Sequence, residues 1–398
     1  LLEGVLASAN VGDNFESFNK AIASATAAEV ADPTVGGDGF TMINRGNKLV
    51  DKDTDLTPNA ELCLVDIAGK MTVVTDDGFK TAADAQAEAE KDANRVTVDI
   101  ERVSSKIEVL VKSGGVSTTG KFAFTGWVLD AVNTKFYPWA KKVDTGTSVG
   151  GSPGFYIKNF YTIDPNYDGN TGIEYNTVTN YEPDVVWLDE ADITYSLENT
   201  MTANDQRIKN ATRVVIKSTF WPDPAWTGDW FQYADDNYEN FAALKAAYDI
   251  ETNLNLRAAC ENLFVKLKAA YSGSDVDFST KTKFGDLTPA EFDKVSAAIT
   301  NGGELAKENH CIRWYQKGLN YYWYEIRHDD GITGANKFAK YGIVRNNWYE
   351  RTLTKVDNPG TPWYPDIVNP GPGDPDPEDP IDEMEGYLGI TVKVMPWV

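Results

Sequence analysis

The sequence predicts a mainly β fold with two β-sandwich domains, a helical insertion in the second domain and a separate strand at the C-terminus. Three observations predict it. Short runs of β-branched and aromatic residues alternate with polar residues and end at turn-forming residues. One long stretch in the second half carries helix signals instead, and a proline-rich segment isolates the last strand. The chain has 398 residues and is 42% hydrophobic, which is enough for two or three domain cores.

Residues 1–165 are expected to form the N-terminal sandwich domain. The Ser113-Gly114-Gly115 cluster follows a predicted strand and is typical of a hairpin turn. The alanine-rich run at residues 81–94 has no β-branched residue after its first position, so it predicts a surface helix between strands. Alternation of apolar and polar residues predicts strands at 95–103, 106–112, 121–130 and 154–163.

Residues 166–357 are expected to form the C-terminal sandwich domain, interrupted by a helical insertion at about 222–310. Thr288 is suited to cap a helix, with a proline at the first helical position and Glu291 completing a capping box. The apolar residues that follow fall on one face, so we expect this helix to pack against a core. The strands of this domain are predicted at 185–197, 212–220 and 319–327.

The segment at residues 358–398 combines a proline-rich linker with a terminal strand. Prolines, glycines and acidic residues fill the stretch from Asn358 to Glu385, which predicts an extended, semi-rigid spacer. The last residues alternate as a strand buried on one face does. The apolar residues of this candidate donor strand, with the tryptophan after it, are Leu388, Ile390, Val392, Val394 and Trp397.

Two interpretations of the terminal strand remain open. A hydrophobic strand on a stiff tether can leave its own domain and complete the sheet of another chain, which would make it a site for binding a neighbouring subunit. Alternatively, it folds back as the last strand of its own domain, as terminal strands commonly do.

Composition and charge argue against several classes of protein. The formal net charge of -23 disfavours binding to nucleic acid, whose backbone attracts clustered lysine and arginine. No apolar run approaches the roughly 18 residues that span a bilayer, and we expect any export signal to have been removed or left out of the sequence. Cys63, Cys260 and Cys311 are widely spaced and form no CxxC pair, which favours buried free thiols over a zinc site or a disulfide framework.

The sequence contains no constellation that requires catalysis, so neither an enzyme nor a cofactor is expected. His310 and His328 are the two histidines, and neither lies in an HExxH or GxSxG context. Asp164, Asn166 and Asp168 have the spacing of the first half of a calcium loop, although the second half departs from the pattern. A plain turn explains the same residues, so no metal is assigned and calcium stays an alternative.

A tryptophan-rich segment offers an alternative function of another class. Trp221, Trp226 and Trp230 could stack on sugar rings while neighbouring aspartates accept hydrogen bonds from sugar hydroxyls. That arrangement would suit a surface protein that binds or degrades glycans. The competing interpretation is that these side chains cover the helical insertion as a satellite core.

Several short motifs follow one another in a fixed order along most of the chain. In the first half they lie at residues 40–44, 98–107, 126–137 and 161–167. In the second half they lie at residues 320–322, 344–349, 358–362, 377–381 and 394–397. In this order they resemble the fimbrillins of Bacteroidales, the shaft subunits of type V pili, and most closely the major subunit of the minor-fimbria (Mfa-like) branch.

The resemblance implies two transthyretin-like β-sandwich domains in a structural subunit of a cell-surface fimbrium, which supports adhesion and biofilm formation. It implies export across the outer membrane as a lipoprotein precursor, and removal of an N-terminal strand by an arginine-directed protease. It also implies a head-to-tail polymer of identical subunits, in which the C-terminal strand of one subunit fills a groove of the next. Accessory tip and anchor subunits, and host or bacterial surface ligands, are the other implied partners.

Overall fold

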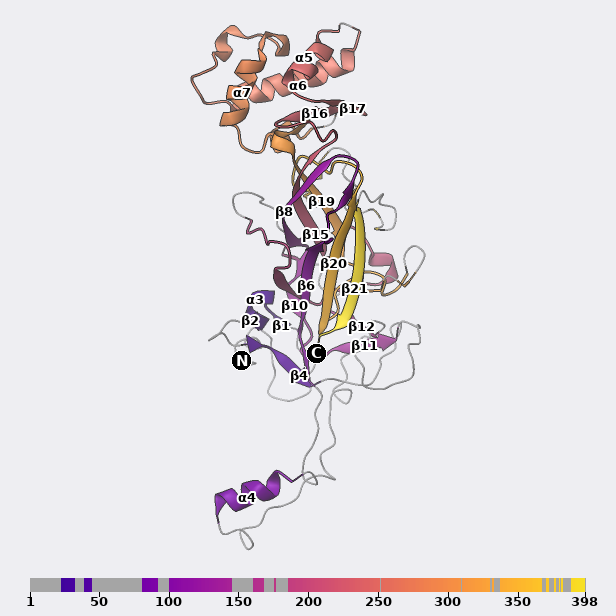
Figure 1. The fold of residues 1–398 in the computed structure, drawn as a ribbon. Coiled ribbons are helices and arrows are strands. Elements are labelled where there is room, and N and C mark those ends of the chain that lie inside the picture. Colours follow the sequence, from indigo (N-terminus) through magenta and orange to yellow (C-terminus); the bar gives the residue numbers. More distant parts are fainter. Residues whose placement is uncertain are drawn as a thin grey trace.

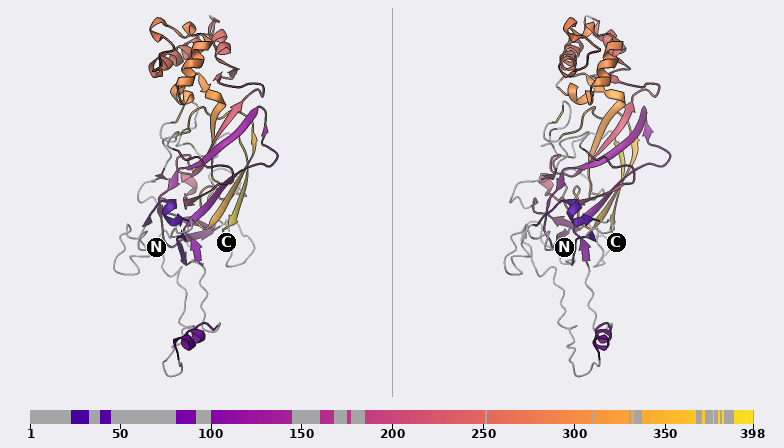
Figure 2. Two further views of the ribbon diagram at one scale, coloured as in Figure 1. Left: turned by 60° about the vertical axis from the view of Figure 1, so that its left-hand side comes forward. Right: turned by 90° about the vertical axis from the view of Figure 1, so that its left-hand side faces the viewer.

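The structure is a computed structural model, and it describes an elongated molecule (Figure 1). Sheets occupy its middle, the helices of residues 241–306 lie at one end, and α4 (Ala82–Ala89) lies at the other, an order that both side views keep (Figure 2). The described residues are 23–32, 39–44, 81–91, 100–144, 160–167, 175–176, 185–250, 252–308, 310–329, 331–332, 337–366, 370–371, 376, 379, 381 and 388–397.

Two sheets form the middle of the molecule. The larger sheet has the order β14-β6-β20-β21, and β7 also pairs with β20. Its strands are β6 (Ser104–Val111), β7 (Ser117–Thr118), β14 (Ile193–Leu197), β20 (Asn347–Val356) and β21 (Leu388–Pro396). The smaller sheet has the order β19-β15-β8, and its strands are β8 (Lys121–Asp130), β15 (Arg213–Trp221) and β19 (Leu319–Glu325). All neighbours are antiparallel except that β6 and β7 run parallel to β20.

The two sheets pack face to face around one core. Buried side chains of β6 and β20, such as Ile107 and Leu353, belong to the same apolar cluster as Trp127 of β8 and Ile216 of β15. Aromatic and β-branched residues at alternate positions supply both inner faces, as the period of two along a strand requires. The expected β-sandwich is thereby confirmed.

The sandwich joins strands from both sides of the boundary expected between residues 165 and 166. Strands β6 and β8 precede that boundary, but β6 pairs with β20 and β8 pairs with β15. A boundary there therefore does not separate the two main sheets. The division into an N-terminal and a C-terminal sandwich, each transthyretin-like, stays a prediction.

The glycine-containing turn at residues 113–115 does not produce a hairpin between its flanking strands. Gly114 and Gly115 have φ values of 87° and 101°, so the turn itself forms where it was predicted. Strands β6 and β7 on either side of it nevertheless both pair with β20 in parallel. The prediction of a hairpin was wrong because β20, distant in sequence, supplies the hydrogen-bond partners for both strands.

Small two-stranded sheets lie at the end of the sandwich that carries the first described residues. The pairs are β1-β10, β2-β3, β4-β5, β9-β13 and β11-β12. Their bounds are β1 (Ala23–Ser24), β2 (Ala31–Asp32), β3 (Gly39–Phe40), β4 (Met42–Asn44), β5 (Ile100–Arg102), β9 (Val132–Asn133), β10 (Lys135–Phe136), β11 (Lys141–Asp144), β12 (Phe160–Ile163) and β13 (Tyr175–Asn176). The short helices α3 (Ala27–Val30) and η4 (Ala203–Asp205) accompany them.

The helical insertion forms a compact unit with its own apolar core (Figure 1). Its helices are α5 (Phe241–Tyr248), α6 (Leu254–Ala270), η5 (Phe278–Thr280), η6 (Phe284–Asp286), α7 (Pro289–Ala298) and α8 (Gly302–Ala306). They pack on a small sheet of β16 (Trp230–Tyr233), β17 (Asp236–Tyr238) and β18 (Arg313–Tyr315), which leads through η7 (Gln316–Gly318) back to β19. The expected helical insertion is confirmed, and its helices lie between Phe241 and Ala306.

The predicted start of α7 is also confirmed. The amide N–H of Glu291 donates to Thr288 Oγ1 at 3.3 Å, and the Glu291 carboxylate accepts from the Thr288 amide at 3.0 Å. This is the capping box that the sequence predicts. The helix then buries Phe292 and Val295 in the core of the insertion.

Candidate functional site

The C-terminal strand β21 lies at the edge of the larger sheet and pairs with β20 of its own chain (Figure 1). Ile390 is opposite Leu353, Val392 is opposite Arg351 and Val394 is opposite Tyr349. Among the strands that the structure describes, none pairs with the other edge of β21. The structure thus has the strand folded back on its own sheet, which is the second of the two interpretations that the sequence left open.

The two faces of β21 differ as the alternation of its residues predicts. Leu388, Ile390 and Val394 pack against the core of the main sandwich and are partly buried. Thr391 and Lys393, which point the other way, are exposed. An edge strand held by one neighbour and by a half-buried face is attached less firmly than a central strand.

Trp397 directly follows β21 and lies among residues from four segments that are distant in sequence. Its ring stacks on Tyr195 at a centroid distance of 5.5 Å and meets Phe40 edge-on at 4.8 Å. The guanidinium of Arg102 lies 4.3 Å from the Trp397 ring centroid and donates to the Trp397 carbonyl oxygen at 2.7 Å. The Trp397 amide donates to the Asn346 carbonyl oxygen at 3.0 Å. We call Phe40, Arg102, Tyr195 and Asn346 the Trp397 cage.

The cage is tied together independently of Trp397. Phe40 and Tyr195 meet edge-on at 5.3 Å, and the Arg102 amide donates to Asn346 Oδ1 at 3.3 Å. Burial lowers the pKa of the Arg102 guanidinium and raises the pKa of the Tyr195 hydroxyl, so both groups lie partly out of water. Sequence reasoning singled out Trp397 but missed the four cage residues, because only the tertiary fold brings their segments together.

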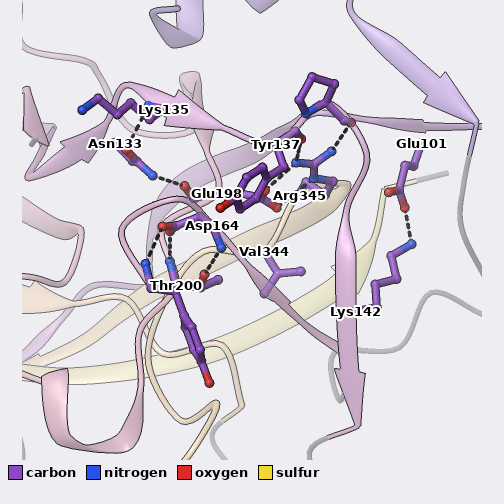
Figure 3. Close-up of polar contacts among 12 residues, drawn as sticks. Glu101, Asn133, Lys135, Tyr137, Lys142, Asp164, Glu198, Thr200, Val344 and Arg345 are labelled. Carbon is purple, nitrogen blue, oxygen red and sulfur yellow. Dashed lines mark hydrogen bonds and ion pairs between the residues drawn. The ribbon is translucent and has the colours of Figure 1, made fainter. Parts of the chain in front are cut away.

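The segment that carries Asn346 is fixed by a buried ion pair. Figure 3 shows the guanidinium of Arg345 between Glu198 and the Tyr137 backbone. Arg345 Nε donates to the Glu198 carboxylate at 2.8 Å, and Arg345 Nη2 donates to the carbonyl oxygen of Tyr137 at 2.6 Å. Both charged side chains are fully buried, so removal of one partner would leave an uncompensated charge. One role of the motif at residues 344–349 is therefore to anchor the sheet end beside the cage.

The start of the proline-rich segment is fixed to the sandwich, which differs from the expectation of a spacer beginning at Asn358. The Tyr315 hydroxyl donates to the Gly360 carbonyl oxygen at 2.9 Å, and Arg213 donates to the carbonyl oxygen of Pro365. Further along, Ile381 is buried in a small apolar cluster and its amide donates to the Gln206 carbonyl oxygen at 3.2 Å. The tail is thus anchored at two points before β21 begins.

The candidate calcium ligands contribute to a turn. The buried Asp164 carboxylate accepts from the backbone N–H groups of Asn166 at 2.6 Å, Tyr167 at 3.2 Å and Thr200 at 2.5 Å (Figure 3 shows the contact with Thr200). Burial is the largest cause that raises the pKa of Asp164 to about 7, against the effect of these donors. Asp168 lies outside the described residues, so a calcium site stays a prediction.

The three tryptophans of the possible glycan site differ in exposure. Trp230 is fully buried, stacks on Tyr315 at 3.8 Å and donates to the Phe220 carbonyl oxygen at 2.8 Å. Trp221 and Trp226 are partly buried and pack against the core of the main sandwich. Trp230 therefore offers no ring face to a sugar in this structure, and the glycan-binding role of the segment stays a prediction.

The histidines and cysteines differ in burial. His328 is buried with Nδ1 2.9 Å from the Tyr349 hydroxyl, whereas His310 is exposed. Cys260 and Cys311 are free thiols, and burial raises the pKa of both. Cys63 lies outside the described residues. Within the described ranges, no group of three or more His, Cys, Asp or Glu residues could hold a metal ion, and no helix is long and apolar enough to cross a membrane.

Together, the fold and the site define a β-sandwich protein whose last strand is an edge strand on a proline-rich tail. Residues 313–398 match the family described as "Major fimbrial subunit protein type IV, Fimbrillin, C-terminal". The expected fimbrillin family is confirmed over these residues, which contain β18 to β21. The match is thus with the C-terminal part of a major fimbrial subunit. The assignment to the minor-fimbria branch stays a prediction.

Two solved structures with some likeness to the chain come from Parabacteroides distasonis and Porphyromonas gingivalis. A proposed cell adhesion protein from Parabacteroides distasonis is 12% identical, with a TM-score of 0.28 and 77% of this chain covered. A fimbrilin from Porphyromonas gingivalis is 15% identical, with a TM-score of 0.26 and 76% covered. The chain spans 55% and 60% of those two structures, respectively. A search of curated proteins gave no match.

Proposed function

We propose that this chain is a shaft or adaptor subunit of a cell-surface fimbrium and that it polymerises by strand exchange. In this mechanism β21 leaves β20 of its own chain and pairs with the sheet of a neighbouring subunit. The observation that carries the proposal is the position of β21, an apolar-faced edge strand at the end of a tail within the matched fimbrillin region. The same contact repeated head to tail gives an open filament.

The energetics of β21 suit a strand that is held but can be exchanged. Each fully buried aliphatic side chain contributes roughly 1.5–3 kcal/mol, and those of β21 are only partly buried. Backbone hydrogen bonds to one neighbour add about 1 kcal/mol each. A new neighbour that covers the strand more completely would therefore hold it more tightly than its own chain does.

The sequence between Ile381 and β21 is long enough for the proposed movement. Ile381 is buried, whereas β21 begins at Leu388. Six residues separate them in the sequence, and six residues span at most about 20 Å when fully extended. The strand could therefore move over a distance of this order without release of Ile381.

The remaining partners follow from the proposed polymer. They are identical subunits along the shaft, accessory tip and anchor subunits at its ends, and a protease that prepares each subunit for assembly. Export as a lipoprotein precursor and support of adhesion and biofilm formation belong to the same proposal. The net charge of -23 is compatible with a surface polymer whose filaments repel one another.

The test compares the full chain with a chain truncated after Glu385, which keeps the buried Ile381 and removes only the strand. Both are treated with trypsin under polymerising conditions and then analysed by size and electron microscopy. We expect ladders or filaments from the full chain alone, with the truncated chain remaining a folded monomer by circular dichroism. Filaments of equal yield from both chains would refute strand exchange.

A further inference from the structure

The alternation of β21 leaves its register undetermined. Leu388, Ile390, Val392 and Val394 are similar in size and repeat every second residue. A slip of two residues along β20 keeps every apolar side chain on the core face, so the pattern by itself does not distinguish one register from the next. A filament with a regular repeat requires a single register, and some other contact must select it.

The Trp397 cage is suited to select the register. It contacts the indole of its occupant twice, because Tyr195 stacks on the ring and the Arg102 guanidinium lies within cation–π distance of it. The cage also forms hydrogen bonds with the backbone of its occupant. The carbonyl oxygen of Trp397 accepts from Arg102, and the Trp397 amide donates to the carbonyl oxygen of Asn346. A slip of two residues would bring Met395 to the cage. Methionine has no aromatic ring on which Tyr195 could stack or over which the Arg102 guanidinium could lie.

The cage is built from the body of the chain and not from the tail. Phe40, Arg102 and Tyr195 come from β3, β5 and β14, and their contacts with one another and with Asn346 do not involve β21. Departure of the tail would therefore leave a preformed pocket that presents two aromatic rings and a guanidinium. The segment that fits this pocket is the C-terminal segment of this sequence, which every other copy also carries.

We propose that the Trp397 cage of one subunit receives Trp397 of the neighbouring subunit and sets the register of the joint between them. In the unassembled chain its own Trp397 fills the cage and keeps the acceptor closed. The two occupancies exclude each other, as in domain swapping, where the same contact is made first within a chain and then between chains. This inference rests on the proposed strand exchange, and it adds the pocket and the residue that the pocket recognises.

The direct test places the photoreactive amino acid benzoylphenylalanine at position 195 of the full chain. Unlabelled and nitrogen-15-labelled chains are mixed, polymerised and irradiated, and the cross-linked peptides are identified by mass spectrometry. We expect cross-links from position 195 to the peptide that contains Trp397. In the monomer the cross-link lies within one chain, so both cross-linked peptides should carry the same label. In the polymer, cross-linked pairs with one labelled and one unlabelled peptide should appear. Polymers without mixed-label cross-links to that peptide would overturn the proposal.

A pair of matched variants gives a second readout. Trp397→Ala removes the occupant of the cage, whereas Trp323→Ala removes a partly buried tryptophan of the smaller sheet, on β19, which pairs with β15. We expect Trp397→Ala to lower the yield of polymer at least tenfold relative to Trp323→Ala, the loss typical of a tryptophan at the centre of an interface. Equal yields from the two variants would overturn the proposal.

The outcome of the truncation experiment separates this inference from the proposed function. If the chain ending at Glu385 polymerises normally, strand exchange itself is wrong and the cage has no assembly role. If the truncated chain fails to polymerise but Trp397→Ala polymerises as Trp323→Ala does, strand exchange stands and the role of the cage is wrong. Loss of polymer in both the truncated chain and Trp397→Ala, with retention in Trp323→Ala, supports both.

Discussion

Replacement of Ile390 by aspartate should release β21 from its own sheet and prevent its pairing with another. Ile390 is partly buried opposite the fully buried Leu353. Loss of its apolar contacts costs about 1–2 kcal/mol, since full burial of such a side chain is worth roughly 1.5–3 kcal/mol. A carboxylate set against the same apolar surface with water nearby costs about 1–2 kcal/mol more. The total of roughly 2–4 kcal/mol raises the population of detached tail about 30- to 900-fold.

The matched control is Thr391→Asp, which introduces the same side chain at the neighbouring, exposed position of the same strand. Both variants carry the low strand propensity of aspartate. The difference between their effects therefore measures the contribution of the apolar contacts on the buried face of β21. The assays are limited proteolysis of the tail in the monomer and electron microscopy under polymerising conditions. We expect a protease-sensitive tail and no filaments for Ile390→Asp, with near-normal behaviour for Thr391→Asp. Equal filament yields from the two variants would refute the assignment of the apolar face.

Three further predictions concern single residues. Val392→Asp should destabilise the docking of β21 on β20 less than Ile390→Asp does. Position 392 lies opposite the buried Arg351, whose positive charge favours a nearby carboxylate. Proteolysis of the tail in the two variants, measured in parallel, checks this order. The contribution of Asp164 to the stability of the folded chain should fall as pH rises from about 4 to about 7, because its pKa is raised to about 7 when folded but lies near 4 when unfolded. Thermal melting across this range should show a smaller slope for Asp164→Asn. Thr288→Ala should destabilise the helical insertion by about 1 kcal/mol through loss of the cap, and no change in chemical denaturation would contradict the capping box.

Elements encoded by local sequence were predicted well. The strand expected at residues 121–130 is β8, with the same bounds, and the capping box at Thr288 forms as expected. The apolar alternation of β21 agrees with the core contacts of Leu388, Ile390 and Val394. These successes have one cause, because strand alternation and helix capping depend on residues within a few positions of one another.

Features that depend on distant partners were not predicted. The turn at residues 113–115 forms, yet its strands pair with β20, more than two hundred residues away. Trp230 belongs to a pattern that suits sugar stacking, but Tyr315 and the Phe220 carbonyl oxygen occupy its ring face and its N–H. In both cases the sequence specifies which contacts a residue is able to make, and the tertiary fold decides which partner lies next to it.

The sequence by itself determined the mainly β class, the helical insertion and an apolar-faced strand on a proline-rich tail. It also carried the fimbrillin resemblance that the match over residues 313–398 confirms. Only the tertiary structure decided that β21 lies on its own sheet and that Phe40, Arg102, Tyr195 and Asn346 surround Trp397. The physical reason is that alternation fixes the face of a strand but not its neighbour or its register, which depend on contacts between segments far apart in the chain.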